Sequence, residues 1–222
     1  MFKSLLSLFL KSNCPLCDRA TSELLCPACS RQLAKMQLSN CARRWPEELP
    51  AFAWGMYDGL LKRAIAALKY ENHPELAQPL GFHLGKAWLD WPNSTSLKNA
   101  TVVPIPMHPK KLQQRGFNQA ELIGRSFCQY TRLKLQPSGL ERARETEAMF
   151  GLSQRDRATN VAGAFILGKS FQRRLPRSPI LLLDDIYTTG ATARSAAQTL
   201  SQQGIEVLGI VAVATPLTMN NE

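Results

Sequence analysis

The sequence has no apolar run that approaches the ~20 residues a membrane-spanning helix needs. Residues 1–10 imitate a secretory signal, because a lysine precedes a run rich in leucine and phenylalanine. The apolar core of this segment is too short, and Lys11 and a cysteine cluster follow where a signal would have a small-residue cleavage site. We therefore expect a short amphipathic helix that packs on the domain, and no membrane span.

Acidic residues are also scarce. The chain has 17 Asp and Glu against 27 Lys and Arg, so its formal net charge is +10. Residues 107–118 and 169–177 contain no acidic residue at all. A basic excess of this size indicates an acidic partner, a phosphorylated ligand, or both. A basic stretch on its own is more often a solvated loop, so the nature of the partner has to be argued from other residues.

Four of the six cysteines form two C-x2-C pairs that are eight residues apart: Cys14, Cys17, Cys26 and Cys29. In the absence of a secretory signal, paired knuckles of this kind are typical of a tetrahedral Zn²⁺ site. A disulfide or redox pair is the alternative. We predict a structural zinc ion held by these four thiolates, in an N-terminal module (residues 1–45) that is too small to fold without metal.

Residues 180–192 are the most informative stretch of the chain. Four aliphatic residues without alternation, at 180–183, predict a strand buried on both faces, as in a parallel sheet. Asp184 and Asp185 follow at its carboxyl end, where ligands bind in open α/β sheets. A small, hydroxyl-rich turn then leads into a helix predicted from about residue 191 to 203. The turn consists of Thr188, Thr189, Gly190, Ala191 and Thr192.

Such a turn offers free backbone N–H groups, hydroxyls and the positive end of a helix dipole, which together suit a phosphate group. The carboxylates suit ribose hydroxyls beside that phosphate, or a hydrated Mg²⁺ ion. The alternative is a buried strand that merely ends in a polar turn. Two adjacent unpaired aspartates would repel each other and add nothing to packing, so we favour a site for a phosphorylated sugar.

The rest of the chain alternates strand and helix patterns, which predicts a parallel α/β sheet flanked by helices. Residues 46–222 are expected to form this domain, after a proline-containing linker at 45–50. Strands are predicted at 51–57, 101–106, 133–137, 163–167 and 205–214. Helices are predicted at about 60–70, from 74 to 89, and at 119–129.

A second anion site is predicted after the strand at residues 101–106. The basic loop at 107–118 contains Lys110, Lys111, Arg115 and Gly116, and a helix begins directly after it. A strand, a basic loop and a helix N-terminus again suit an anion. A solvated basic loop is the alternative.

Residues 142–159 form a long, charged segment with little apolar content. Long irregular loops in compact domains are often lids, and closing a lid over a labile sugar pyrophosphate would exclude water and bring arginines to its leaving group. The lid residues expected on this basis are Arg142, Arg144, Thr146 and Arg157.

The central stretch at 180–192 resembles the phosphoribosyl-pyrophosphate (PRPP) signature of type I phosphoribosyltransferases. The resemblance implies that Asp184 and Asp185 hold the ribose 2′- and 3′-hydroxyls, while residues 188–192 wrap the 5′-phosphate. Purine-salvage members of that superfamily carry a further Asp where this chain has Thr188. The resemblance therefore argues against a purine-salvage reaction.

The whole chain, taken in order, resembles the ComF (ComFC or GntX) family of competence-associated, phosphoribosyltransferase-like proteins. The resemblance rests on the two cysteine pairs, on the central stretch, and on residues 57–59, 103–106, 115–119 and 163–165. It also includes the single residues Ile65, Leu68, Lys69, Tyr70, Thr146, Leu152, Ser153, Arg157 and Asn160. It implies an N-terminal zinc, a PRPP pocket that works with Mg²⁺, and a role with imported single-stranded DNA in natural transformation. It further implies a cytoplasmic protein, or one peripheral at the inner membrane, that works with the competence helicase and DNA-processing proteins. Many members have a third cysteine pair, of which only Cys41 is obvious here, and many have Gln where this chain has Met149.

Two readings of the function remain open. In the first, an enzyme transfers a phosphoribosyl group from PRPP and Mg²⁺, within DNA uptake or apart from it, and Arg115 with Lys110 or Lys111 stabilises the departing pyrophosphate. No acceptor and no general base can be named. In the second, a DNA-uptake adaptor keeps the PRPP pocket as a sensor or vestige and binds single strands through basic surface. The basic residues outside the pocket are Arg43, Arg44, Lys169, Arg173, Arg174 and Arg177.

Overall fold

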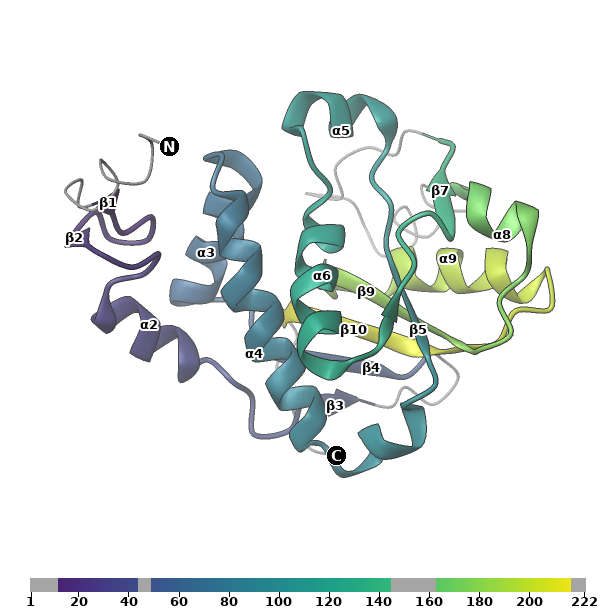
Figure 1. The fold of residues 1–222 in the computed structure, drawn as a ribbon, viewed down its shortest axis with the longest axis horizontal. Helices are drawn as coiled ribbons and strands as arrows, with labels where there is room; N and C mark the ends of the chain where they lie inside the picture. The colour runs from purple at the N-terminus through teal and green to yellow at the C-terminus, as the bar shows by residue number, and fades with distance from the viewer. Residues whose placement is uncertain (1–11, 44–48, 145–162, 217–222) are drawn as a thin grey trace, which may run out of the picture.

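The computed structural model describes residues 12–43, 49–144 and 163–216, and its centre is a six-stranded sheet (Figure 1). The strand order is β3-β4-β10-β9-β5-β6, and all neighbouring pairs are parallel except β3 with β4. This confirms the predicted parallel sheet. The strands are β3 (Ala42–Arg43), β4 (Ala51–Met56), β5 (Thr101–Pro104), β6 (Lys134–Leu135), β9 (Ile180–Ile186) and β10 (Val207–Thr215).

Helices cover both faces of this sheet. One face is covered by α3 (Gly59–Tyr70), α4 (Ala77–Asp90) and α6 (Gln119–Thr131), and the other by α9 (Ala191–Ser201). Within the described ranges, none of the helices has the length and apolar character needed to cross a membrane. The remaining elements are short: β1 (Ser12–Asn13), β2 (Ala20–Thr21), α2 (Pro27–Ala34), η1 (Pro74–Leu76), η2 (Pro92–Leu97), α5 (Pro109–Arg115), β7 (Leu140–Arg142), β8 (Phe165–Leu167) and α8 (Lys169–Arg173).

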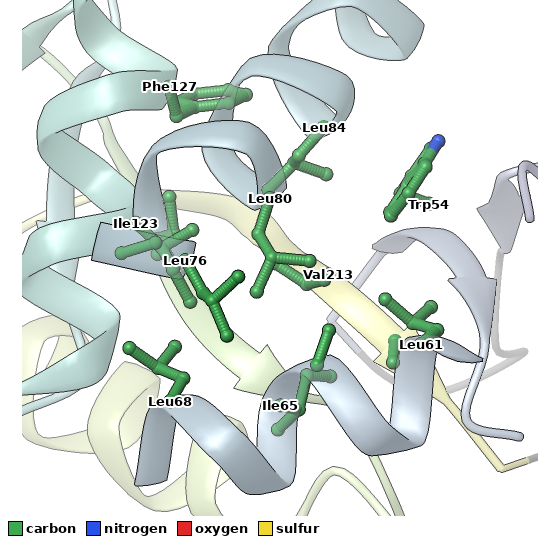
Figure 2. Packing of buried hydrophobic residues seen from close by; sticks show 14 of the residues in the cluster. Trp54, Leu61, Ile65, Leu68, Leu76, Leu80, Leu84, Ile123, Phe127 and Val213 are labelled. Carbon is green, nitrogen blue, oxygen red and sulfur yellow. The ribbon is translucent and has the colours of Figure 1, made fainter. Parts of the chain in front are cut away.

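Strand β9 lacks alternation because each of its faces meets a separate core. Leu181 and Leu183 belong to the cluster under α3, α4 and α6, whereas Ile180 and Leu182 belong to the cluster under α9. Figure 2 shows the first cluster, in which apolar side chains of α3, α4 and α6 converge above β10. The labelled residues are Trp54, Leu61, Ile65, Leu68, Leu76, Leu80, Leu84, Ile123, Phe127 and Val213.

The connections after β5 and β9 run in opposite directions across the sheet. From β5 the chain passes through α6 to β6 at the sheet edge, and from β9 it passes through α9 to β10 on the other side. The two strands are direct neighbours, with Pro104 paired to Leu183 in the register. Their carboxyl ends therefore flank a topological switch point, the position at which open α/β sheets bind ligands.

Two local expectations differ from the structure. Residues 107–118 are not a loop throughout, because α5 begins at Pro109 and is capped by Gly116, whose φ of 83° is left-handed. No residue of α5 is buried, so the segment carries no apolar stripe that could have revealed it. The strand β8 forms within 163–167, yet it pairs antiparallel with β7 in a separate two-stranded sheet.

The N-terminal module shares its apolar core with the main domain. Leu16, Leu25 and Leu33 are buried in the same cluster as Leu61 of α3. Arg63 of α3 donates to the carbonyl of Pro15 at 3.3 Å, and it also forms a bidentate pair with Glu71, both bonds 2.8 Å. Figure 1 accordingly shows the module lying beside α3.

Close packing between α4 and α6 depends on Gly81. A Cβ atom at this position would lie 2.4 Å from the carbonyl oxygen of Ile123 and 2.6 Å from Cβ of Ser126. We expect Gly81→Ala to lower the free energy of unfolding by about 1–3 kcal/mol, although alanine favours helix. Denaturant unfolding would measure it. Gly85→Ala is the matched control, because the added Cβ would meet only the Tyr130 side chain at 3.2 Å and then the Phe127 carbonyl at 3.5 Å. Equal effects of the two variants would contradict this interpretation.

Candidate functional site

The turn after β9 is shaped by Gly190. This glycine is the N-cap of α9 with a φ of 75°, and a Cβ here would lie 2.5 Å from the Tyr187 hydroxyl and 2.9 Å from Nη1 of Arg194. The left-handed backbone favours glycine at this position, and the two side-chain ends leave little room for a Cβ atom. The α9 N-terminus has no side-chain cap, and within the described parts of the chain the buried hydroxyl of Thr189 has no hydrogen-bond partner. Unused donors at a helix N-terminus suit an anion.

The two aspartates before this turn have different surroundings. Asp184 is half-buried, and its Oδ1 accepts the backbone N–H of Asp185 at 2.8 Å. Asp185 is 3% exposed, and its Oδ2 forms an ion pair with the ammonium of Lys69. The amide of Gln119 donates to Oδ1 of Asp185 at 3.3 Å. The expectation that the two acids are unpaired is therefore wrong for Asp185.

Sequence reasoning missed Lys69 and Gln119 as members of this site. Both residues carry part of the family resemblance and mark the ends of helical patterns, but the sequence assigned neither of them a role in the site. The fold brings the last turn of α3 and the first turn of α6 to the carboxyl end of β9. Nothing in the local pattern of either helix indicates that its polar end residue meets a carboxylate.

This arrangement separates the proton affinities of the two acids. Burial raises the pKa of Asp184 well above its ordinary value, and the Asp185 charge adds to the increase. Burial also acts to raise the pKa of Asp185, but the Lys69 ammonium outweighs it and brings that pKa below the ordinary value. The pKa of Lys69 is raised, because attraction to Asp185 exceeds the cost of burial. The Lys69 ammonium therefore favours the charged form of Asp185 over the charged form of Asp184.

Arg115 is joined to the carboxyl pair through Gln119. Its Nη1 donates to Oε1 of Gln119 at 2.6 Å, and its guanidinium lies 5.5 Å from the ring centroid of Tyr70. Gly116 directly follows it at the α5 C-cap. The structure thus brings the basic loop to the carboxyl end of β9 through Arg115. Lys110 lies on α5 with an exposed side chain, and Lys111 is half-buried.

The predicted lid is only partly within the described residues. Arg142 is the last residue of β7, with its guanidinium 5.4 Å from the Phe165 ring centroid. Burial lowers the pKa of Arg142, and the charge of Asp184 opposes that shift. Arg144 is exposed. Thr146 and Arg157 lie outside the described residues, as do residues 1–11 with the expected amphipathic helix.

The cysteine cluster forms a compact centre apart from the β9 site. The sulfur atoms of Cys14, Cys17, Cys26 and Cys29 all lie within 4.8 Å of one another. A tetrahedral zinc ion with bonds of about 2.3 Å would place its sulfurs about 3.8 Å apart, so four thiolates here fit that ion. No disulfide joins any of the six cysteines, all of which lie in the described ranges.

The N-terminal end of α2 favours a thiolate. Cys26 is the N-cap of α2, and a hydrogen bond from the backbone N–H of Cys29 lowers the pKa of Cys26 to about 7. Cys41 lies outside the cluster: its thiol donates to the Leu38 carbonyl at 3.3 Å, and burial raises its pKa to about 11. Cys41 is therefore a local packing residue within the described chain.

A cavity of about 470 Å³ lies at the opposite end of the strands. Its lining includes Ala51, Leu181 and Gly209 near the amino ends of β4, β9 and β10, together with Trp88 and Trp91. None of the residues of the carboxyl pair or of the α9 turn lines it.

Comparison with known proteins confirms the resemblance to the ComF family. The chain is 27% identical over 176 residues to Competence protein F of Haemophilus influenzae, covering 79% of this chain and 76% of that protein. It is 29% identical over 145 residues to the DNA utilization protein YhgH of Escherichia coli K12, covering 65% and 62%. It is 24% identical over 152 residues to Competence protein ComFC of Bacillus subtilis, covering 67% and 56%. The matches thus leave a quarter to nearly half of each relative uncovered.

Solved structures of adenine phosphoribosyltransferase are also similar. One covers 85% of this chain and 99% of its own, with a TM-score of 0.39 and 16% identity. Another, from Leishmania donovani, covers 86% and 82%, with a TM-score of 0.38 and 14% identity. No protein-family model matches the chain.

The geometry of the cysteine cluster predicts a metal content that can be measured. Purified protein should contain about one zinc per chain by elemental analysis, because four close thiolates complete a closed structural site. Cys26→Ser should release the metal and expose the N-terminal module to proteolysis, since metal binding and folding are coupled. Cys41→Ser is the control and should keep the metal, because Cys41 lies outside the cluster. A metal-free wild-type protein with a protease-resistant N-terminus would refute the site.

Proposed function

We propose that this protein binds the 5-phosphoribosyl group of PRPP at the carboxyl end of β9. The observation that carries the proposal is the order of groups at the switch point. Two adjacent carboxyls are followed by the uncapped N-terminus of α9 and by the Thr189 hydroxyl, which has no partner within the described chain. Carboxyls recognise sugar hydroxyls, and a helix N-terminus recognises the phosphate of the same sugar. A single strand and turn then match both ends of a ribose 5-phosphate.

The neighbouring residues suit the second end of PRPP. Arg115 is tied to the carboxyl pair through Gln119, so its positive charge is available to the pyrophosphate at the ribose C1 position. A bound Mg²⁺ would supply further neutralisation of that pyrophosphate. In a transferase reaction, a nucleophilic acceptor would form a bond to the ribose C1 as the C1–oxygen bond to pyrophosphate breaks. Arg115 would stabilise the departing pyrophosphate, which leaves with the bonding electron pair, and Lys110 and Lys111 would extend the basic surface beyond it.

The setting we propose is DNA uptake in competence. Relatives named for competence and for DNA utilization match along 65–79% of this chain. The chain spans less than two thirds of some of these relatives, so their whole activity is not transferred here. We propose that the PRPP site belongs to this process, either as an enzyme or as a sensor.

PRPP should stabilise the folded protein, because a ligand that binds only the native state shifts unfolding by mass action. The stabilisation would be about 2.7 kcal/mol at a hundredfold excess over Kd. Thr189→Val should weaken PRPP binding roughly tenfold or more, because it removes one charge-assisted hydrogen bond to phosphate. Differential scanning fluorimetry and calorimetric titration would measure both effects.

Thr189→Val separates an effect on binding from an effect on stability. The Thr189 hydroxyl has no protein partner in the described chain, so its removal should leave the melting temperature of the unliganded protein unchanged or higher. Asp184→Ala should likewise weaken PRPP binding without loss of the fold, because burial already penalises its charged form. Absence of any PRPP effect on the wild-type protein at millimolar concentration would refute the proposed site.

A second candidate function is direct binding of single-stranded DNA. The observation that favours it is an exposed, acid-free run that includes α8 and the residues after it. Its four cations, all exposed, are Lys169, Arg173, Arg174 and Arg177. Basic surface of this kind follows a phosphate backbone without reading its sequence.

Replacing Arg173, Arg174 and Arg177 together by Glu should lower affinity for single-stranded DNA and flatten its salt dependence. The log–log slope with salt changes by about 0.7 for each phosphate that the protein no longer neutralises. Fluorescence anisotropy at several salt concentrations would measure the slope. The matched control changes three exposed lysines elsewhere to Glu: Lys62, Lys86 and Lys98. An equal decrease in both variants would indicate nonspecific charge attraction, and no binding at low salt would remove the direct-binding function.

A further inference from the structure

Lys69 carries a buried positive charge at the edge of the proposed sugar site. It lies in the last turn of α3, and its side chain is 15% exposed, while that of Asp185 is 5% exposed. Removing two charges from water in this way is costly unless each is closely paired. An apolar pair of similar size would often stabilise a fold as well, so the ion pair calls for an explanation beyond stability.

Asp185 is already engaged by the protein through both carboxylate oxygens. Oδ2 contacts the Lys69 ammonium, and Oδ1 accepts the amide of Gln119 at 3.3 Å. Gln119 is itself oriented by Arg115, whose Nη1 donates to its Oε1 at 2.6 Å. Asp184 differs, because it accepts the local backbone N–H of Asp185 at 2.8 Å and is more exposed than Asp185.

The charges around the pair come from several elements. Lys69 faces Asp185 from α3, and Tyr70 adds a weak influence on Lys69. Gln119 of α6 is neutral, and Arg115 of α5 acts through it. Arg142 of β7 interacts electrostatically with Asp184. Lys69 is therefore the cation that pairs directly with Asp185, while Arg142 acts on Asp184.

We propose that Lys69 is the positioning residue of the sugar-binding pair: its ammonium fixes the negative charge on Asp185 and leaves Asp184 as the carboxyl that contacts the ribose hydroxyls. This inference rests on the proposed phosphoribosyl site. Asp184 is more exposed than Asp185, and its carboxyl oxygens can accept hydrogen bonds from a hydroxyl pair. Because the chain supplies its own cation at the carboxyls, the sugar needs no divalent ion there. Binding of ribose 5-phosphate, which has no pyrophosphate, is therefore independent of Mg²⁺.

The charge assignment can be tested without any ligand. In the full-length, ligand-free protein, ¹³C NMR of the side-chain carboxyls would follow the titration of Asp184 and Asp185. In the wild type, Asp185 should titrate at lower pH than Asp184. In Lys69→Met the pKa of Asp185 should rise and the separation should shrink, whereas Lys69→Arg should restore the order. An unchanged titration in Lys69→Met, or Asp184 titrating at lower pH than Asp185 in the wild type, would overturn the proposal.

The ligand contact is tested by calorimetry with ribose 5-phosphate, with and without Mg²⁺. Lys69→Met should lower the affinity for ribose 5-phosphate roughly tenfold or more and make that affinity depend on pH. The substitution leaves the buried carboxylate of Asp185 without its cation, so the two aspartates compete for a proton and change their hydrogen bonds. Because that variant can unfold, the double variant Lys69→Met with Asp185→Asn removes both charges together and should fold. It should keep ribose 5-phosphate affinity within a few-fold of the wild type, because Asp184 remains.

The outcomes separate the two ideas. Loss of ribose 5-phosphate binding in the folded double variant would show that Asp185 contacts the sugar, and would overturn the inference while leaving the phosphoribosyl site intact. A requirement for Mg²⁺ in ribose 5-phosphate binding would also overturn it. If the wild-type protein binds neither ribose 5-phosphate nor PRPP, the proposed function fails. The order in which Asp184 and Asp185 titrate then decides separately whether Lys69 holds the negative charge on Asp185.

Discussion

The carboxyl end of β9 depends on one interaction, the buried ion pair between Lys69 and Asp185. Two adjacent acids in a low-dielectric site cannot both ionise without a compensating cation. The ammonium of Lys69, from α3, is that cation, and the amide of Gln119 donates a hydrogen bond to the other carboxylate oxygen of Asp185. The same contact ties the last turn of α3 to the middle of the sheet. The proposed ligand site and the docking of α3 on the sheet therefore depend on the same pair of charges.

Glycine at two positions where the chain meets close neighbours is the second requirement of this architecture. Gly190 allows the turn after β9 to bend into α9 beside Tyr187 and Arg194, and Gly81 allows α4 to lie against α6. Both glycines lack the Cβ that would collide with neighbouring atoms. The helix α6 is thereby held with its N-terminus, capped by Asn118, beside β5. The switch-point crevice is thus bordered by helix ends fixed through packing.

The N-terminal module illustrates how a small unit is stabilised. It is too short to bury a core of its own, and its leucines join the cluster under α3. Its four thiols converge in a geometry that fits one tetrahedral ion. The contact of Arg63 with the Pro15 carbonyl fastens the first cysteine knuckle to α3, whose last turn carries Lys69. The cysteine cluster and the proposed sugar site are therefore linked through one helix, although their chemistries are separate.

The sequence by itself determined the parallel sheet, the cysteine cluster and the position of Asp184 and Asp185, because an unbroken apolar strand, C-x2-C spacing and a strand followed by a glycine turn are local patterns. It could not show α5, which has no apolar stripe, or the pairing of β8 with β7, which depends on contacts distant in sequence. Only the tertiary structure decided that Lys69 and Gln119 meet Asp185. Their helices are separated from β9 by many residues. The apolar pattern of each helix predicts which of its faces is buried, but it does not predict which carboxylate the polar residue at its end will contact.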